Sequence, residues 1–269
     1  MTEILLGDMK ALQREMKALQ REIKLARNIQ TRLLTSINPT IFNGEITGIS
    51  LPARMISGDY YDFYPMADNK MRFIIADVMG KGIPAAMLMI LTRGAFRSAC
   101  TTTTDPAQTL MTMNDALYSD LRTLGCFVTA CCAEWDPASK TLSYATAGHS
   151  SPLCIQSGKP LFTNMPIKSG VFLGGLPNQK YSNLSLKLEL GDYVLFYTDG
   201  VIEAQNQQGE LYKLERLINV AVNQTGKSVN EIECTITNSL HDFTSGLQQK
   251  DDITMVILKI TNEWDDNDV

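Results

Sequence analysis

Apolar residues near the N-terminus recur in steps of four and three, the spacing of the contact seam of a coiled-coil helix. The seam comprises Leu5, Met9, Leu12, Met16, Leu19, Ile23, Ala26, Gln30 and Leu33. The heptad at residues 9–15 is repeated without change at residues 16–22, so the period is seven. The pattern predicts a left-handed coiled coil of about four heptads, with residues 1–37 as a helical segment ahead of the folded domain.

Two partners can bury this seam. We favour a second copy of the chain and predict a homodimer through residues 5–33, because a strict heptad period suits a supercoil better than a flat core surface. The alternative is one amphipathic helix that packs on its own domain. Gln30 is a polar position on the seam that sets the register or marks the end of the coil. Pro39 then ends the helical segment.

Strand-like and helix-like patterns follow one another through the rest of the chain. Strands are expected at 45–52, on both sides of a turn at 65–70, and at 127–135, 141–147, 152–155, 181–190, 193–197 and 253–260. Helices are expected at 84–100, 105–124 and 211–223, and from Ser228 onward, whereas 164–180 is expected to be a long surface loop. This mixture predicts an α/β or α+β domain over residues 41–262, followed by an acidic tail at 263–269.

Charge and cysteine content exclude several classes of function. The net charge is −5 over 269 residues. Residues 1–36 carry seven Lys/Arg and four Asp/Glu, a surplus of three positive charges, so the remainder is at −8 and is a poor nucleic-acid binder. The six cysteines form no CxxC pair, no secretory signal precedes them, and no apolar run is long enough for a membrane span. We therefore expect a reduced, soluble, cytoplasmic protein.

Four aspartates share one local context, at the end of a strand-like apolar run and beside a turn. They are Asp59, Asp77, Asp199 and Asp251. Any one of them alone is best interpreted as a turn cap. Together, without His or Cys, they favour a site for Mg²⁺ or Mn²⁺, and we expect Asp59 and Asp77 to meet across the sheet. Two such ions can activate a bridging water and hold a phosphoryl group.

Five motifs in order carry a resemblance to a known family. The segments SGDYYDF, ADVMGKGIPAAMLM, ATAGHSSP, LFYTDGVIEA and DDITMVILKI resemble the PPM family of metal-dependent protein phosphatases, in its bacterial SpoIIE/RsbU-type branch. The resemblance covers roughly residues 44–260. It implies a four-layer α-β-β-α sandwich of the α+β class, preceded here by the N-terminal coiled-coil helix.

The resemblance also implies roles for individual residues. Asp59, Asp77 and the backbone carbonyl of Val78 would hold one Mn²⁺ or Mg²⁺ ion, and Asp77, Asp199 and Asp251 a second. Asp252 could replace Asp251 or hydrogen-bond a water ligand. Arg54 corresponds to a phosphate-binding arginine in relatives, although a surface ion pair is an equally good interpretation.

Three further residues are interpreted as structural. Asp62 lies on the strand face opposite Asp59 by the period of two. Eukaryotic relatives carry a histidine after the aspartate that corresponds to Asp77, and this chain has none there. Lys81 is a potential donor in its place but is better interpreted as an exposed turn residue, and His149 as a satisfied turn histidine.

The sequence thus predicts a serine/threonine phosphoprotein phosphatase that uses metal-activated water. By family likeness, its substrate would be a phosphorylated regulatory protein such as an anti-sigma-factor antagonist. There are two alternatives: a catalytically silent sensor or scaffold with the same fold, and a two-metal phosphohydrolase for a small molecule.

Overall fold

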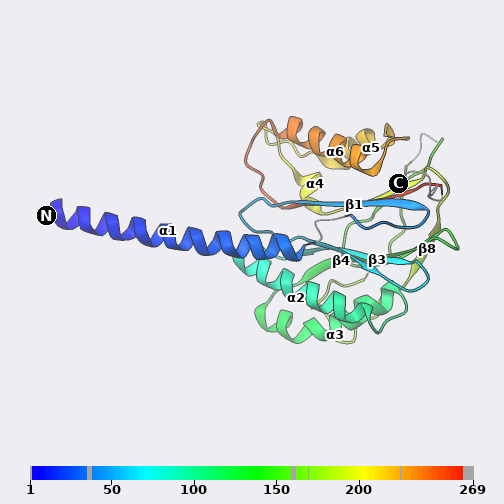
Figure 1. Ribbon diagram of the computed structural model, residues 1–269, viewed down its shortest axis with the longest axis horizontal. Coiled ribbons are helices and arrows are strands. Elements are labelled where there is room, and N and C mark those ends of the chain that lie inside the picture. The colour runs from blue at the N-terminus through cyan, green and yellow to red at the C-terminus, as the bar shows by residue number, and fades with distance from the viewer. Residues whose placement is uncertain (1, 35–37, 159–161, 169, 225, 263–269) are drawn as a thin grey trace.

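A computed structural model describes the whole chain except residues 1, 35–37, 159–161, 169, 225 and 263–269. Two five-stranded antiparallel sheets lie face to face, with helices on both outer faces (Figure 1). The four-layer α+β sandwich expected from the sequence is therefore confirmed, whereas the acidic tail at 263–269 lies outside the described residues.

The first sheet has the strand order β1-β10-β9-β6-β7. Its strands are β1 (Gly44–Leu51), β6 (Leu153–Ile155), β7 (Phe162–Asn164), β9 (Tyr193–Tyr197) and β10 (Ile253–Ile260). The second sheet has the order β2-β3-β4-β5-β8. Its strands are β2 (Tyr60–Pro65), β3 (Met71–Val78), β4 (Val128–Asp136), β5 (Thr141–Ala147) and β8 (Leu184–Lys187).

Alternation of side chains along the strands divides the core into three layers. The central layer between the sheets contains Phe63, Phe73, Phe196 and Val256. Side chains on the other strand faces pack under helices. α2 (Ile83–Cys100) and α3 (Pro106–Leu124) cover the second sheet, and α4 (Asp199–Glu203), α5 (Lys213–Val222) and α6 (Val229–Thr244) cover the first (Figure 1).

Helix ends follow the expected capping chemistry. The Asp105 side chain accepts a hydrogen bond from the Gln108 backbone N–H, with Pro106 in the first turn of α3. Ser228 and Glu231 form a reciprocal capping box at the start of α6. These local bonds fix where the helices begin, so their starts were predictable from the sequence.

Three expectations about the second half of the chain need correction. The strand expected at 181–190 is only Leu184–Lys187 at a sheet edge. The loop expected at 164–180 begins inside β7, and its Met165 and Leu173 are buried, so it is not wholly a surface loop. The short helix α4 was not expected, because five residues are too few to show a helical period.

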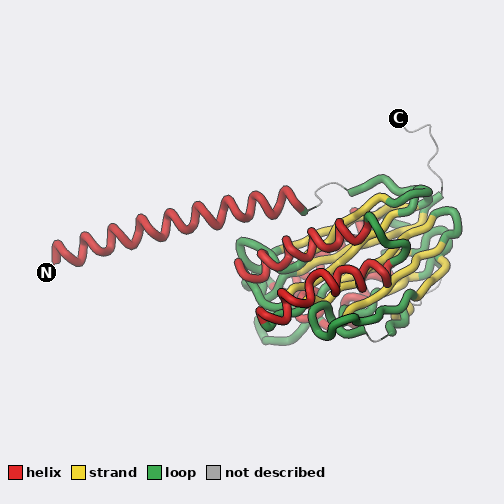
Figure 2. The backbone as a smooth tube through the Cα atoms, turned by 90° about the horizontal axis from the view of Figure 1, so that it is seen from below, coloured by secondary structure: helices red, strands yellow, loops and turns green. Residues whose placement is uncertain are grey.

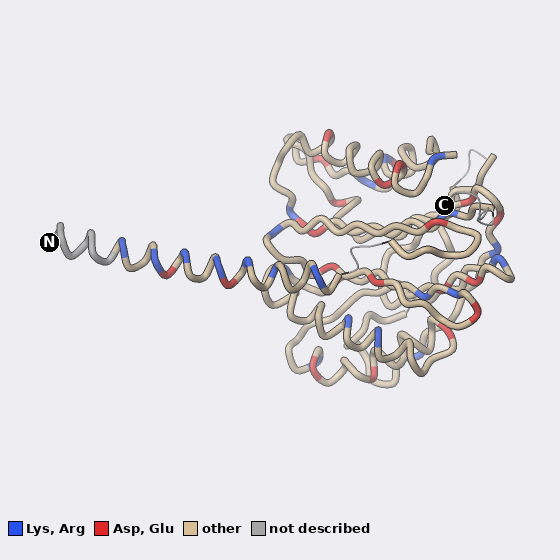
Figure 3. The backbone as a smooth tube through the Cα atoms, in the orientation of Figure 1, with Lys and Arg blue, Asp and Glu red and all other residues tan. Residues whose placement is uncertain are grey.

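The N-terminal helix α1 (Thr2–Leu33) projects from the body over most of its length (Figures 1 and 2). Met9, Leu12, Met16 and Leu19 on its seam are between 54% and 58% exposed. Basic residues are spaced along it (Figure 3). The intramolecular alternative therefore fails for this part of the seam, which is left without an apolar partner among the described residues.

Candidate active site

Asp59 and Asp77 lie side by side at one end of the second sheet. β2 pairs with β3 so that Tyr60 faces Ala76, which places Asp59, the residue before β2, opposite Asp77. Asp59 is 2% exposed. Gly58 precedes it where an added Cβ would lie 3.2 Å from the Val78 carbonyl oxygen, so the two backbones approach closely. The expected meeting of the two aspartates across the sheet is confirmed.

The first sheet brings Asp199 and Asp251 to the same place. Asp199 follows β9 and begins α4, and Asp251 lies just before β10, the strand paired with β9. A Cβ on Gly200 would lie only 2.0 Å from the Asp252 backbone oxygen, so only glycine allows this approach. The Thr198 hydroxyl donates to Asp59 Oδ2 at 2.9 Å and thereby joins the ends of the two sheets.

The carboxylates repel one another in a poorly solvated site. Burial, followed by the charge of Asp77, raises the pKa of Asp59 well above its usual value. Burial, followed by the charges of Asp199 and Asp251, raises the pKa of Asp77 to about 7. Burial and the neighbouring Asp251 also raise the pKa of Asp199. Such a set of carboxylates is stabilised by added positive charge.

The two neighbouring aspartates at the start of β10 have different surroundings. Asp252 is buried: its Oδ1 accepts from the Ala53 N–H at 2.7 Å, and its Oδ2 from the Gly58 N–H at 2.7 Å and the Ser57 hydroxyl at 2.9 Å. The Asp251 side chain is 36% exposed and forms an ion pair with Lys81 at 2.7 Å. Asp252 thus holds the segment that leads to Asp59, while Asp251 faces solvent.

Two basic side chains lie at the turn after β3, and one of them, Lys81, borders the cluster. Lys81 is a turn residue, as expected, but it is not free: its ammonium pairs with Asp251 and donates to the Lys250 carbonyl at 2.5 Å. Arg54 has no ion-pair partner among the described residues, which removes the surface ion pair as its explanation. Its Nη1 lies 3.5 Å from where a Cβ on Gly82 would be, so the guanidinium lies over the turn that carries Lys81.

Asp62 and His149 take no direct part in the cluster. Asp62 accepts hydrogen bonds from the Tyr60 hydroxyl and from Arg97 Nη1, both at 2.8 Å, which agrees with a structural role under α2. His149 is buried, and its Nδ1 lies 3.0 Å from the Thr129 hydroxyl. Burial lowers the pKa of His149 to about 4, so the ring is neutral at pH 7 and is not a proton donor there.

The donor set fits hard divalent cations. Oxygen ligands without thiolate or imidazole are typical of Mg²⁺ and Mn²⁺ sites. Among the described residues no three acidic, His or Cys side chains are close enough to hold one ion by themselves. Electrostatic coupling connects Asp77 to Asp59, to Asp199 and to Asp251. Mg²⁺ is commonly held by one or two carboxylates and completed by water, which this arrangement matches.

Comparisons with known proteins agree with this geometry. The PP2C-type phosphatase domain of SiaA from Pseudomonas aeruginosa has the same fold, with a TM-score of 0.80 at 20% identity over 91% of this chain and 98% of that one. RsbX, solved in complex with magnesium, matches with a TM-score of 0.63 at 18% identity, covering 84% of this chain and 99% of that one. The fold is that of the PP2C-type protein phosphatases.

Sequence similarity narrows the class. The family model for Stage II sporulation protein E (SpoIIE) matches residues 67–261. The phosphoserine phosphatase RsbU of Bacillus subtilis is 31% identical over 241 residues, which cover 88% of this chain and 69% of RsbU. The chain therefore belongs to the SpoIIE family of PP2C-type phosphatases.

Sequence reasoning missed two polar residues that build the site. Thr198 donates to Asp59, and Gln30 of α1 holds Ser57 through two hydrogen bonds, Gln30 Nε2 to the Ser57 carbonyl at 2.8 Å and the Ser57 N–H to Gln30 Oε1 at 3.0 Å. Gln30 was noticed only as an interruption of the seam. That interruption was the available signal, because a buried amide needs a polar partner.

Proposed function

We propose that this chain hydrolyses phosphoserine, and by extension phosphothreonine, on a regulatory protein, with water as the direct nucleophile. The carboxylate cluster, where burial and repulsion raise the pKa of Asp77 to about 7, is the observation that carries this proposal. Membership of the SpoIIE family and the similarity to RsbU support the activity and the class of substrate. An anti-sigma-factor antagonist is the type of regulatory protein that we favour.

Asp59, Asp77 and the Val78 carbonyl are assigned to one Mn²⁺ or Mg²⁺ ion, and Asp77, Asp199 and Asp251 to a second. The last three carboxylates are too far apart in this structure to hold one ion together, so binding of the second ion would have to draw them closer. When bound, such ions lower the pKa of water and neutralise charge on a phosphoryl group. Asp252 is the alternative to Asp251 as a ligand. Because its two oxygens already accept three hydrogen bonds from residues 53–58, we assign it the positioning of Asp59.

Arg54 is assigned to the substrate phosphate. Its guanidinium lies over the turn that carries Lys81 and has no acidic partner among the described residues, and guanidinium binds phosphate oxygens through paired hydrogen bonds. We assign no residue as the proton donor for the leaving serine oxygen. Lys81 is paired with Asp251, and the ring of His149 is neutral at pH 7.

The site proposal is tested by two substitutions that preserve shape. Asp77→Asn and Asp199→Asn each remove one charge from the cluster, so phosphate release from a phosphoserine peptide in Mn²⁺ should fall by about a thousandfold or more. Circular dichroism should show an unchanged fold. Activity within tenfold of the parent in both variants would refute the assignment.

We further propose that residues 5–33 pair in a parallel homodimer. The exposed apolar residues of α1 support this, because a coiled coil buries such a seam. Light scattering should give a dimer for the full chain and a monomer for a chain that begins at Asn38. The double variant Leu12→Asp and Leu19→Asp should also be monomeric. A full chain that is monomeric at tens of micromolar would refute the dimer.

A further inference from the structure

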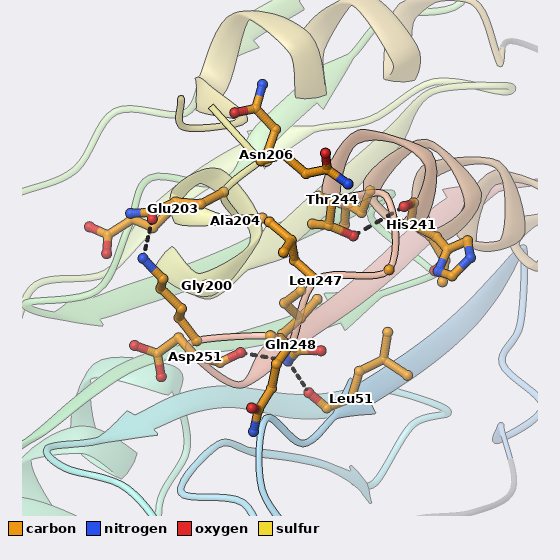
Figure 4. Close-up of a pocket in the computed structure, with 18 of the residues that line it drawn as sticks. Leu51, Gly200, Glu203, Ala204, Asn206, His241, Thr244, Leu247, Gln248 and Asp251 are labelled. Atoms are coloured by element: carbon orange, nitrogen blue, oxygen red, sulfur yellow. Dashed lines mark hydrogen bonds between the residues drawn. The ribbon is translucent and has the colours of Figure 1, made fainter. Parts of the chain in front are cut away.

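A cavity of about 730 Å³ opens beside the carboxylate cluster, and no role has yet been given to it. It lies between the turn after α4, the C-terminal part of α6 and residues 246–251 (Figure 4). Lys81, Gly200 and Asp251 line the cavity, and they also border the carboxylate cluster. Its size is within the range of ligand sites, and Asp251 belongs both to its lining and to the carboxylate cluster.

Side-chain amides are the most numerous kind of polar group in the lining of this cavity. They are Gln205, Asn206, Gln207, Gln248 and Gln249. A carboxamide offers one acceptor and two donors without net charge, which matches the N–H and C=O groups of an extended peptide. Apolar side chains such as Leu51, Leu240 and Ile253 supply surface for side chains of the occupant.

Some of these amides are already fixed and others are available. Gln249 donates to the carbonyls of Leu51 and Asp251, and Gln205 accepts from Lys250. Gln207 and Gln248 are exposed and have no hydrogen-bond partner among the described residues. The fixed amides give the cavity a defined shape, and the available ones can bind an incoming chain.

The charges around the cavity argue against a strongly anionic occupant. Glu203 and Asp251 oppose Lys81 and Lys250 in the lining, so neither sign dominates. A nucleotide or a second phosphate group would need an excess of cations or a cradle of backbone N–H groups. A neutral polar chain is the occupant that this lining fits.

We propose that this cavity binds the polypeptide segment next to the phosphoserine of the substrate, with Gln207 and Gln248 as hydrogen-bonding residues. This rests on the proposed phosphatase function and deepens it, because it makes recognition depend on the flanking backbone. The cavity would therefore contribute to the turnover of a peptide substrate but not to that of a small phosphate ester, which reaches the carboxylate cluster without entering the cavity.

The test compares three substrates in Mn²⁺: short phosphoserine peptides with randomised flanks, free phosphoserine, and para-nitrophenyl phosphate. The double variant Gln207→Ala and Gln248→Ala should lower kcat/KM for the peptides about tenfold, mainly through KM, because two hydrogen bonds are lost. Turnover of para-nitrophenyl phosphate should stay within twofold. Gln208→Ala is the matched control, because Gln208 is an exposed neighbour outside the cavity.

Leu247→Trp provides a second, independent perturbation, because Leu247 is 44% exposed and a larger side chain there should narrow the cavity. It should reduce peptide turnover and spare the small ester. The proposal would be overturned if the parent had no higher kcat/KM for the peptides than for free phosphoserine. It would also be overturned if the variants lost the same fraction of kcat/KM on all substrates. Failure of the parent to hydrolyse any of the three substrates would instead refute the phosphatase function itself.

Discussion

The carboxylate cluster should make the metal-free protein lose stability as the pH rises. The pKa of Asp77 is raised from 3.8 to about 7 by burial and by Asp199 and Asp251. Below pH 3.8 the carboxyl is protonated in both the folded and unfolded chain. Between pH 3.8 and 7 the unfolded chain releases the proton while the folded chain retains it, so the free energy of unfolding falls with rising pH.

The size of this loss follows from the difference between the two pKa values. A pKa raised from 3.8 to about 7 corresponds to about 4 kcal/mol, all of it lost once the pH exceeds 7. The raised pKa values of Asp59 and Asp199 act in the same direction. This is a large part of the stability of a typical domain, which is about 5–15 kcal/mol.

Urea unfolding in EDTA at pH 5 and pH 8 measures this effect. The parent protein should be less stable at pH 8 by about 2–4 kcal/mol. Asp77→Asn should flatten the dependence and be more stable than the parent at pH 8, although it is inactive. Asp120→Asn, at an exposed position on α3, is the control. Equal stability of the metal-free parent at both pH values, or an unchanged slope in Asp77→Asn, would refute the reasoning.

Four further substitutions separate the roles of neighbouring residues. Arg54→Ala should lower kcat/KM for a phosphoserine peptide by about ten- to a hundredfold, because a charge-assisted contact is lost. The affinity for Mn²⁺, measured by calorimetry, should not change. Unchanged kinetics would show that Arg54 does not bind the substrate phosphate. Asp252→Ala should lower the free energy of unfolding by about 2–4 kcal/mol, because three donors lose their acceptor. Asp251→Ala should instead weaken Mn²⁺ binding and leave the stability nearly unchanged. The reverse pattern would exchange the roles of the two aspartates. Gln30→Ala should leave the Ser57 N–H and C=O unpaired and so reduce turnover. Hydrogen exchange should show faster opening of residues 53–58. Unaltered exchange would exclude the proposal that α1 positions Asp59 through Ser57.

Local patterns predicted the elements that have strong local causes. β5 at Thr141–Ala147 and β10 at Ile253–Ile260 match the expected strands residue for residue. The Asp105 cap and the Ser228 capping box also formed as expected. These features depend on neighbours a few residues apart, which a sequence displays directly.

Contacts between distant segments could not be predicted in the same way. Thr198 and Asp59 are 139 residues apart, and Gln30 and Ser57 are 27 apart. No periodicity relates such pairs, since the first meets only when the two sheets pack and the second only when the end of α1 docks on the domain. The different surroundings of Asp251 and Asp252 have the same origin, because residues 53–58 select one of the two as their acceptor.

The most direct test of the central claim is phosphate release from a phosphoserine-bearing regulatory protein, measured with one preparation of the full chain in EDTA and after addition of Mn²⁺. We expect negligible release in EDTA and sustained turnover after Mn²⁺ is added in excess, because the clustered carboxylates require cations to form a working site. Equal release under both conditions, or none in Mn²⁺ or Mg²⁺, would contradict it.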